Sequence, residues 1–426
     1  MSKGKIIAIT GPNASGKSLY VEKMRRTLAS DSVRYIAFRD SYGANVDGAY
    51  YLQLRWNQHD IDQETPTAGE LLERSFLLTG EDSLERRKLQ NNLYQLFSID
   101  DLKDKLIISL SSGELRKFQL TRTLMANPKT LIMDNPFIGL DAEAREQLRQ
   151  LLLTLSEERE MTIYIVVSRE KDIPLYVSER IVMEETPQRQ EPDLQAILKL
   201  PYKNDDYHAE EVVKMNKVSI RYGERTILSE LDWTVRNGEH WALSGRNGSG
   251  KSTLLSLVCA DNPQSYACDI SLFGWARGTG ETIWQIKRHI GYVSPEMHRS
   301  YHRDLPALRI VASGLKDTVG LYVKPTEEEK EQCRWWMRVF GIEHLADRSF
   351  LQISSGEQRM VLLARAFVKD PELLILDEPL HGLDEGNRQR VKDIVEAFCK
   401  RQNKTLIFVT HYEEDLPPCI DHRLYL

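Results

Sequence analysis

Two stretches of the same form decide the fold: GPNASGKS at Gly11–Ser18 and GRNGSGKS at Gly245–Ser252. Each follows a short apolar run, KIIAIT or HWALS, and precedes a segment with the apolar spacing of a helix. A glycine-rich loop between a strand and a helix presents backbone N–H groups and the helix N-terminus to phosphate. The two stretches therefore predict two phosphate-binding loops, each in its own α/β nucleotide-binding core.

The motifs that follow each loop also occur twice, in the same order. The first copy has LSSGELR at Leu110–Arg116 and TLIMDNP at Thr130–Pro136, and the second has ISSGEQR at Ile353–Arg359 and LLILDEP at Leu373–Pro379. TLIMD and LLILD are continuous apolar runs, which are typical of strands buried on both faces of a parallel sheet. The repeat predicts two copies of one domain fused in tandem.

Composition shifts place the domain boundaries. We predict a first domain at 1–185, a linker at 186–212 and a second domain at 213–426, because the segment between the repeats is polar, contains three prolines and lacks sustained periodicity. Between each glycine loop and its SSGE segment lie helix-like runs such as TAGELLERSFLL and TEEEKEQCRWWMRVFGI. These runs predict a helical subdomain inserted into each core.

The overall composition excludes several classes of protein. The 426 residues include 57 basic and 63 acidic side chains, so the chain lacks the basic excess of proteins that coat nucleic acid. No stretch approaches the roughly 20 consecutive apolar residues of a membrane-spanning helix. We expect a cytoplasmic protein, either free or peripheral at the inner face of the cell membrane. The five cysteines contain no C-x-x-C pair and predict reduced thiols rather than a disulfide framework or a zinc cluster.

The glycine loops assign roles to individual residues. Lys17 and Lys251 are expected to neutralise the β- and γ-phosphate oxygens of ATP, and the hydroxyls of Ser18 and Ser252 to ligate Mg²⁺. The predicted nucleotide-binding residues of the two loops are Gly11, Asn13, Gly16, Lys17, Ser18, Gly245, Asn247, Gly248, Gly250, Lys251, Ser252 and Thr253. Asp134 and Asp377 end the buried strands, where a carboxylate can orient water on Mg²⁺ from the sheet edge.

Only the second copy has groups suited to activating water. Glu378 directly follows Asp377 and can polarise the attacking water, while His411, at the end of the strand TLIFVTH, can contact the γ-phosphate. Together with Lys251 these two residues are the predicted catalytic set.

The first copy differs at both positions. Asn135 stands in the place of Glu378, and alignment of YIVVSRE with LIFVTHY puts Arg169 in the place of His411. An amide cannot accept a proton as a carboxylate can. The first site is therefore expected to bind nucleotide and to hydrolyse it poorly.

At this point the sequence resembles the ATP-binding cassette (ABC) family, and the two SSGE segments carry the resemblance. They are similar to the signature motif of that family, with Ser111 and Gly113 in the first copy and Ser354 and Gly356 in the second at the phosphate-contacting places. The resemblance implies two P-loop NTPase domains of ABC type, ATP and Mg²⁺ as ligands, and an intramolecular head-to-tail pair of cassettes. More narrowly, it points to twin-cassette ATP-binding proteins of molybdate transport.

Two further residues follow from the resemblance. Tyr222, in VSIRYGERTIL ahead of the second loop, is expected to stack on adenine through its aromatic face, and the first copy has no such residue. Glu296 stands where the family has a glutamine that contacts Mg²⁺ and senses the transmembrane partner. We include Glu296 among the predicted metal-binding residues.

Three functions remain open at the level of sequence. The first is an ATPase that drives or regulates a transporter for a molybdate-type oxyanion, with membrane permease subunits as partners. The second is a twin-cassette translation factor on the ribosome, which the linker disfavours because it holds six acidic and three basic residues. The third is an ATPase of DNA maintenance, for which the sequence offers no zinc hook or long coiled coil.

Overall fold

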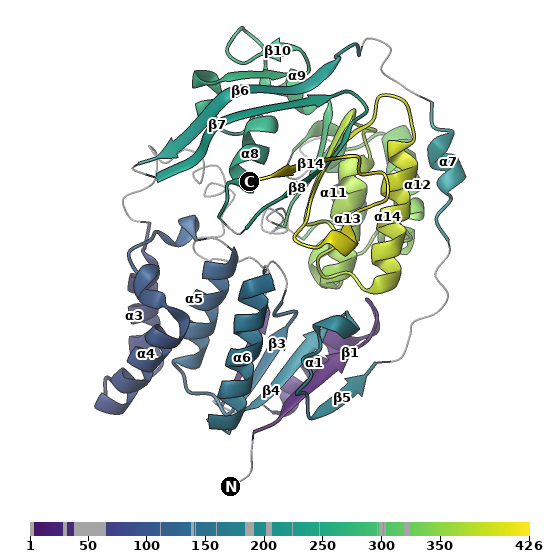
Figure 1. The fold of residues 1–426 in the computed structure, drawn as a ribbon. Helices are drawn as coiled ribbons and strands as arrows, with labels where there is room; N and C mark the ends of the chain where they lie inside the picture. Colours follow the sequence, from purple (N-terminus) through teal and green to yellow (C-terminus); the bar gives the residue numbers. More distant parts are fainter. Residues whose placement is uncertain are drawn as a thin grey trace. The chain divides into compact units, whose positions relative to one another are not determined.

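The computed structural model describes residues 4–28, 32–37, 65–110, 112–137, 140, 142–158, 160–183, 191–201, 207–223, 225–246, 248–295, 297, 301, 304–318 and 324–426. These residues form two compact units (Figure 1). Nearly all of those up to Met183 belong to the first unit, and nearly all of those from Glu191 onward belong to the second.

The first unit is built on a parallel sheet of five strands in the order β2-β3-β4-β1-β5. The strands are β1 (Ile6–Thr10), β2 (Val33–Ala37), β3 (Thr130–Asp134), β4 (Thr162–Val167) and β5 (Glu179–Val182). Their apolar side chains are largely buried, as parallel strands covered on both faces require. The order places one strand, β4, between the strand that leads into the first glycine loop and the strand that ends in Asp134.

The helices of the first unit are α1 (Lys17–Thr27), α3 (Ala68–Leu78), α4 (Leu84–Phe97), α5 (Ser112–Leu124) and α6 (Ala142–Glu158). Helix α3 begins at a capping box in which Thr67 and Glu70 bond each other's backbone N–H. Helices α3 and α4 both pack on α5 and bury Phe76 and Phe97 in the shared core. Helices α3 and α4 lie between the first glycine loop and the SSGE segment, where the sequence predicts an inserted helical subdomain.

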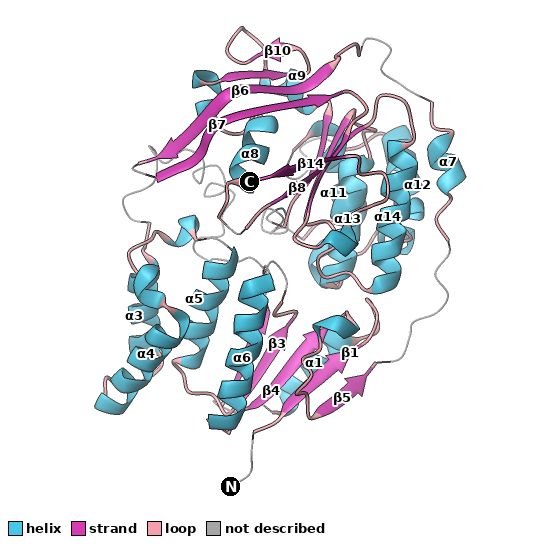
Figure 2. Ribbon diagram, viewed as in Figure 1, coloured by secondary structure: helices cyan, strands magenta, loops and turns pink. Residues whose placement is uncertain are grey.

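The second unit repeats this plan and adds another sheet (Figure 2). Its parallel sheet has the order β11-β12-β13-β8-β14, with strands β8 (His240–Ser244), β11 (Ile290–Val293), β12 (Leu373–Asp377), β13 (Thr405–Val409) and β14 (His422–Tyr425). The second, antiparallel sheet has the order β10-β9-β6-β7, with strands β6 (Glu211–Tyr222), β7 (Arg225–Arg236), β9 (Asp269–Leu272) and β10 (Trp275–Ala276). The predicted α/β class with two repeated cores is confirmed.

The helices of the second unit are α8 (Lys251–Val258), α9 (Ile283–Lys287), α11 (Ala307–Ser313), α12 (Glu327–Val339), α13 (Ser355–Phe367) and α14 (Glu385–Cys399). Helices α11 and α12 lie between the second glycine loop and its SSGE segment, where the sequence predicts the inserted subdomain, and both pack on α13. The rings of Trp336, Phe340 and Phe367 form its centre, with centroids 5.3 Å apart for both contacts with Phe367. Among the described helices, none combines the length and apolar character needed to cross a membrane.

The segment predicted as a linker contains some regular structure. A short helix, α7 (Leu194–Leu198), begins at Asp193, whose side chain accepts a hydrogen bond from the N–H of Ala196. The side chain of Ile197 is buried. Strand β6 begins at Glu211, just before the end of the predicted linker.

Candidate nucleotide-binding and hydrolysis sites

The two glycine loops lead into the helices that follow them with the same backbone conformation. Gly16 and Gly250 precede α1 and α8 with φ of 87° and 100°, the left-handed conformation that glycine adopts without strain. Neither helix start has a side-chain cap. The N–H groups of the first turn of each helix are therefore available to an anion.

The first glycine of each loop is fixed by close approach of the neighbouring edge strand. A Cβ added to Gly11 would lie 2.9 Å from the carbonyl oxygen of Met183, and one added to Gly245 would lie 2.6 Å from that of Leu426. Both positions also have positive φ, 147° and 154°. Only glycine fits there, so the edge strands β5 and β14 explain why each loop opens with that residue.

The two loop lysines are held over their own loops. Lys17 Nζ donates hydrogen bonds to two loop carbonyl oxygens at 2.5 and 2.6 Å. Lys251 Nζ donates to the two corresponding carbonyl oxygens at 2.7 and 2.8 Å. The positive charge of each lysine is thus held within its loop, as a group that neutralises phosphate oxygens requires.

A second pair of loop side chains fits the same ligand. The hydroxyl oxygens of Ser15 and Ser249 are buried and have no hydrogen-bond partner among the described residues. An unpaired buried hydroxyl is costly, so two of them at matching positions indicate a missing polar partner. A phosphate chain in each loop would supply that partner. Neither serine is among the nucleotide-binding residues predicted from the sequence.

The remaining loop residues lie where the sequence places them, and their roles stay predictions. Ser18 and Ser252 follow the lysines in the first turns of α1 and α8 and are exposed, while Asn13 and Thr253 are buried. Gly248 has a φ of 81°. Asn247 lies outside the described residues.

Asp134 and Asp377 end strands β3 and β12 in the same register, opposite Val166 and Val409 respectively. A tyrosine on the adjacent strand accompanies each of them: Tyr35 pairs with Ile132, and Tyr292 pairs with Ile375. The hydroxyl of Tyr35 donates to Asp134 Oδ2 at 3.2 Å. Burial, and then the charge of Asp377, raise the pKa of Tyr292 well above its usual range. The two tyrosines became recognisable only through strand pairing.

Glu378 is buried and faces two histidines. His411 Nε2 lies 3.5 Å from Glu378 Oε1, and His381 Nε2 lies 2.8 Å from Glu378 Oε2. Burial by itself would raise the pKa of Glu378, but His381, His411 and Lys251 outweigh it and hold the pKa below its ordinary value. The predicted pair Glu378 and His411 is thus brought together in space. His381 is a third member that the sequence analysis missed.

We expect His381→Gln to raise the pKa of Glu378. Glutamine can still donate a hydrogen bond but cannot carry the positive charge that favours the carboxylate. A carboxylate with a lowered pKa stays ionised to lower pH. Glu378 therefore stops acting as a base only when the pH falls below that pKa, and this protonation sets the acidic limb of the kcat profile. The acidic limb of the kcat profile should therefore move to higher pH in the variant. The exposed His344→Gln should leave the limb in place, and an unmoved limb in both variants would refute the role of His381.

The first unit has the same backbone at the corresponding position but different chemistry. Asn135 has a φ of 53°, close to the 48° of Glu378. Its side-chain amide donates to Asp134 Oδ1 at 2.8 Å. Arg169, which takes the place of His411, is buried just after β4. Among the described residues, the carboxylate that the second unit has at this position is thus replaced by an amide in the first unit.

The signature segment of the second unit opens helix α13. Ser354 is its N-cap and forms a capping box with Glu357: Ser354 Oγ accepts from the N–H of Glu357 at 3.3 Å, and Glu357 Oε2 accepts from the N–H of Ser354 at 2.8 Å. Gly356 is buried in the first turn, and Gly113 lies in the first turn of α5. Ser111 and Glu296 lie outside the described residues.

Tyr222 ends strand β6, where the hairpin to β7 begins, and it is half-buried. Its hydroxyl accepts a hydrogen bond from Asn262 Nδ2 at 3.1 Å. The same sheet reaches the second glycine loop, because a Cβ at Gly250 would lie 3.0 Å from Leu228 Cδ2 and 3.1 Å from Ile227 Cγ2. Stacking of Tyr222 on adenine remains a prediction.

Arg359 links helix α13 to two backbone segments of the second unit. It is buried and donates to the carbonyl oxygens of Ser294 at 3.0 Å, of Pro379 at 3.2 Å and of Glu378. These bonds fix the backbone of the predicted catalytic glutamate from the side of the signature helix. In the sequence Arg359 is recognisable only as the last residue of the ISSGEQR motif.

An ion pair is repeated in both units, buried in the second and half-buried in the first. In the second unit Arg388 pairs with Asp415, and Arg388 Nη1 donates to the carbonyl oxygen of Leu380 at 2.9 Å. In the first unit Arg145 Nη1 lies 2.8 Å from Asp172 Oδ1, and Arg145 Nη2 donates to the carbonyl oxygen of Phe137 at 3.2 Å. Each arginine thus connects the turn that follows β3 or β12 to the turn that follows the neighbouring strand, β4 or β13. No local sequence pattern identifies either pair.

Comparison with known proteins identifies the class. The profile of the ABC transporter family matches residues 1–138 and 228–381, which together exceed half of the chain. The chain therefore belongs to the ABC transporter family and is a twin-cassette ATPase that binds and hydrolyses ATP.

Individual relatives place it more closely. The chain is 36% identical to the ABC transporter ATP-binding protein ModF of Escherichia coli (strain K12), across 100% of this chain and 91% of that protein. It is 32% identical to the uncharacterized ABC transporter ATP-binding protein YlmA of Bacillus subtilis (strain 168), across 50% of this chain and 81% of the relative. The solved structure of an RNase-L Inhibitor aligns with 100% of this chain and 84% of its own, with 16% identity and a TM-score of 0.53. That structural likeness concerns the fold alone.

Proposed function

We propose that the second unit performs most of the ATP hydrolysis, whereas the first binds ATP and turns it over poorly. The observation that carries this proposal is the buried Glu378 between two histidines, set against Asn135 at the same backbone position. The two loops are alike, so we expect both to bind nucleotide. The groups that would activate water differ.

Each site residue of the second unit has a definite role in this proposal. The N–H groups of α8 and the ammonium of Lys251 bind the phosphates, and the hydroxyl of Ser249 donates to them. Ser252 and Asp377 would hold Mg²⁺, which supplies positive charge to the phosphate oxygens when bound. Glu378 accepts the proton of the attacking water, and His411 donates to the γ-phosphate. The lowered pKa of Glu378 keeps it ionised and ready to accept that proton.

We further propose that this ATPase is the ATP-binding component or a regulator of an ABC transporter, with a molybdate-type oxyanion as its cargo and membrane permease subunits as its partners. The full-length similarity to ModF, named an ABC transporter ATP-binding protein, supports the transporter role. The oxyanion rests on the narrower sequence resemblance described above.

Co-purification tests the transporter role. The tagged chain carrying Glu378→Gln, a change expected to prolong the ATP-bound state, should be recovered from gently solubilised native membranes with Mg-ATP present. Permease subunits identified by mass spectrometry are the expected result, and Lys251→Ala should lose them. Recovery of ribosomes or of DNA-bound proteins in place of permease subunits would contradict the proposal and favour a translation or DNA-maintenance role.

The first site should hold nucleotide persistently. Its loop keeps Lys17 and the unpaired Ser15 hydroxyl, but its water-activating groups are replaced, so bound ATP is not consumed. We expect Lys17→Ala to abolish the fraction of radiolabelled ATP that survives washing, and to slow turnover at the second site. Lys23→Ala, on the exposed face of the same helix, is the matched control. Equal retention in both variants would leave the first site without the proposed role.

A further inference from the structure

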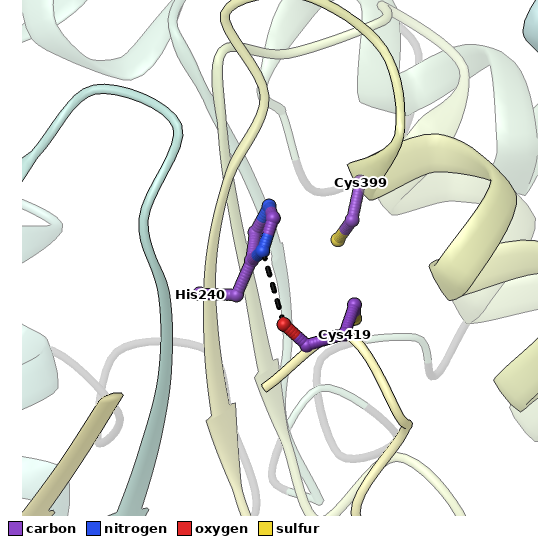
Figure 3. A group of neighbouring side chains, drawn as sticks. All are labelled: His240, Cys399 and Cys419. Carbon is purple, nitrogen blue, oxygen red and sulfur yellow. Dashed lines mark hydrogen bonds between the residues drawn. The ribbon is translucent and has the colours of Figure 1, made fainter. Parts of the chain in front are cut away.

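Three metal-ligating side chains converge in the second unit, away from the residues assigned to nucleotide. His240 is the first residue of β8, Cys399 is the last of α14, and Cys419 precedes β14. One ring nitrogen and the two sulfur atoms all lie within 4.8 Å of one another (Figure 3). Among the described residues this is the one cluster of its kind.

Two thiols and an imidazole form the donor set that zinc-class ions prefer. Around a tetrahedral ion, with bonds of about 2.3 Å to sulfur and about 2.0 Å to nitrogen, the ligand atoms stand about 3.5–3.8 Å apart. The observed separations need to contract by only about 1 Å to reach that geometry. Rotation of the Cys419 side chain, which is half-buried, can provide much of this contraction.

Both ring nitrogens of His240 face carbonyl oxygens. Its Nδ1 lies 3.1 Å from the carbonyl oxygen of Cys419, and its Nε2 lies 3.2 Å from that of Lys404. A neutral imidazole carries only one N–H. Its other nitrogen therefore points a lone pair at the lone pair of a carbonyl oxygen, and the two repel. Asp421 Oδ2, 3.6 Å from Nδ1, adds a negative charge. A metal ion bound to that nitrogen relieves the conflict.

Charge balance selects a divalent ion. Two thiolates and a neutral imidazole around a divalent ion carry no net charge. Binding releases the two thiol protons to solvent and changes no oxidation state.

We propose that His240, Cys399 and Cys419 bind one divalent thiophilic ion of the zinc class. The site lies at the start of β8, whereas the phosphate loop follows the end of that strand, so the ion and the nucleotide occupy opposite ends. The ion joins the end of α14 and the approach to β14 to the central sheet. It therefore stabilises the second unit and does not compete with ATP.

Cadmium ion is the probe, because its bonds to thiolates absorb in the ultraviolet. Titration of the reduced full-length protein, with Mg-ATP in excess to occupy the nucleotide sites, should give one equivalent of Cd²⁺, a thiolate absorption band and a rise in melting temperature. Cys419→Ser should weaken binding by at least about 10-fold and abolish the rise. Cys268→Ser is the matched control, because this half-buried cysteine lies outside the cluster.

Alkylation followed by mass spectrometry keeps the test independent of any variant. In the wild-type protein Cd²⁺ should protect Cys419 from iodoacetamide while Cys268 continues to react. Unchanged reactivity of Cys419, or full Cd²⁺ affinity in Cys419→Ser, would overturn the proposal. The proposal would also be overturned if the reduced protein bound no Cd²⁺ and Cys399 and Cys419 formed a disulfide in air.

Discussion

Glu378→Gln should lower kcat for ATP hydrolysis by about 100-fold or more. The glutamine side chain has almost the same shape, so ATP binding should be unchanged, but an amide cannot accept the proton of the attacking water. Phosphate release under steady-state conditions measures the rate, and equilibrium binding of labelled ATP measures affinity. The loss should appear in kcat and leave binding intact, because the carboxylate acts on the transition state.

Two controls sharpen this test. Glu327→Gln removes a carboxylate that is almost fully exposed at the start of α12, and it should hydrolyse ATP normally. Asn135→Asp adds a carboxylate to the first unit, yet it should do little, because Arg169 stands where the second unit has His411. Near-normal turnover of Glu378→Gln would refute the assignment of the general base. A large gain in ATP hydrolysis by Asn135→Asp would refute the view that the first unit lacks more than one of the groups that activate water.

Arg388→Met should lower the free energy of unfolding of the second unit by about 3–5 kcal/mol. The side chains of Arg388 and Asp415 are each only 4% exposed, so the substitution leaves a buried carboxylate without its counter-charge. Urea unfolding followed by tryptophan fluorescence is suited to the measurement, because six of the seven tryptophans lie within residues 213–426.

Two further variants distinguish the cost of the unpaired charge in Arg388→Met from a general loss of packing. The double variant Arg388→Met with Asp415→Leu removes both charges and should recover most of the loss, since an apolar pair avoids the cost of an unpaired buried ion. Arg423→Met breaks a pair with Glu413 whose side chains are 63% and 71% exposed, and should cost less than about 1 kcal/mol. Equal losses for Arg388→Met and Arg423→Met would contradict the argument from burial.

Much of the architecture could be predicted from the sequence because its signals are local. The glycine loops, the apolar runs that end in Asp134 and Asp377, and the helical runs each lie within a short segment, and the repeat doubles every one of them. The short helix α7 was missed because five residues carry too little periodicity to be distinguished from a turn.

The parts of the site that could not be predicted depend on contacts between distant segments. Tyr35 meets Asp134 only through strand pairing, and Arg388 meets Asp415 only because two turns lie side by side. His381 stands within the DEPLHGLD segment, but its role appears only when its ring is found beside the Glu378 carboxylate. The cysteines show the same limit, because Cys399 and Cys419 approach His240 through folding and not through a recognisable spacing.

The left-handed backbone at Asn135 constrains how this position can vary. Asparagine, aspartate and glycine adopt that conformation most easily, whereas other residues strain the chain by about 1–2 kcal/mol. Glu378 bears such strain in the second unit, where its carboxylate has partners on both sides. In the first unit asparagine relieves the strain, and its amide bonds the neighbouring aspartate. Giving up the acid there thus makes the turn easier to form, so stability favours asparagine at the same position where catalysis would demand glutamate.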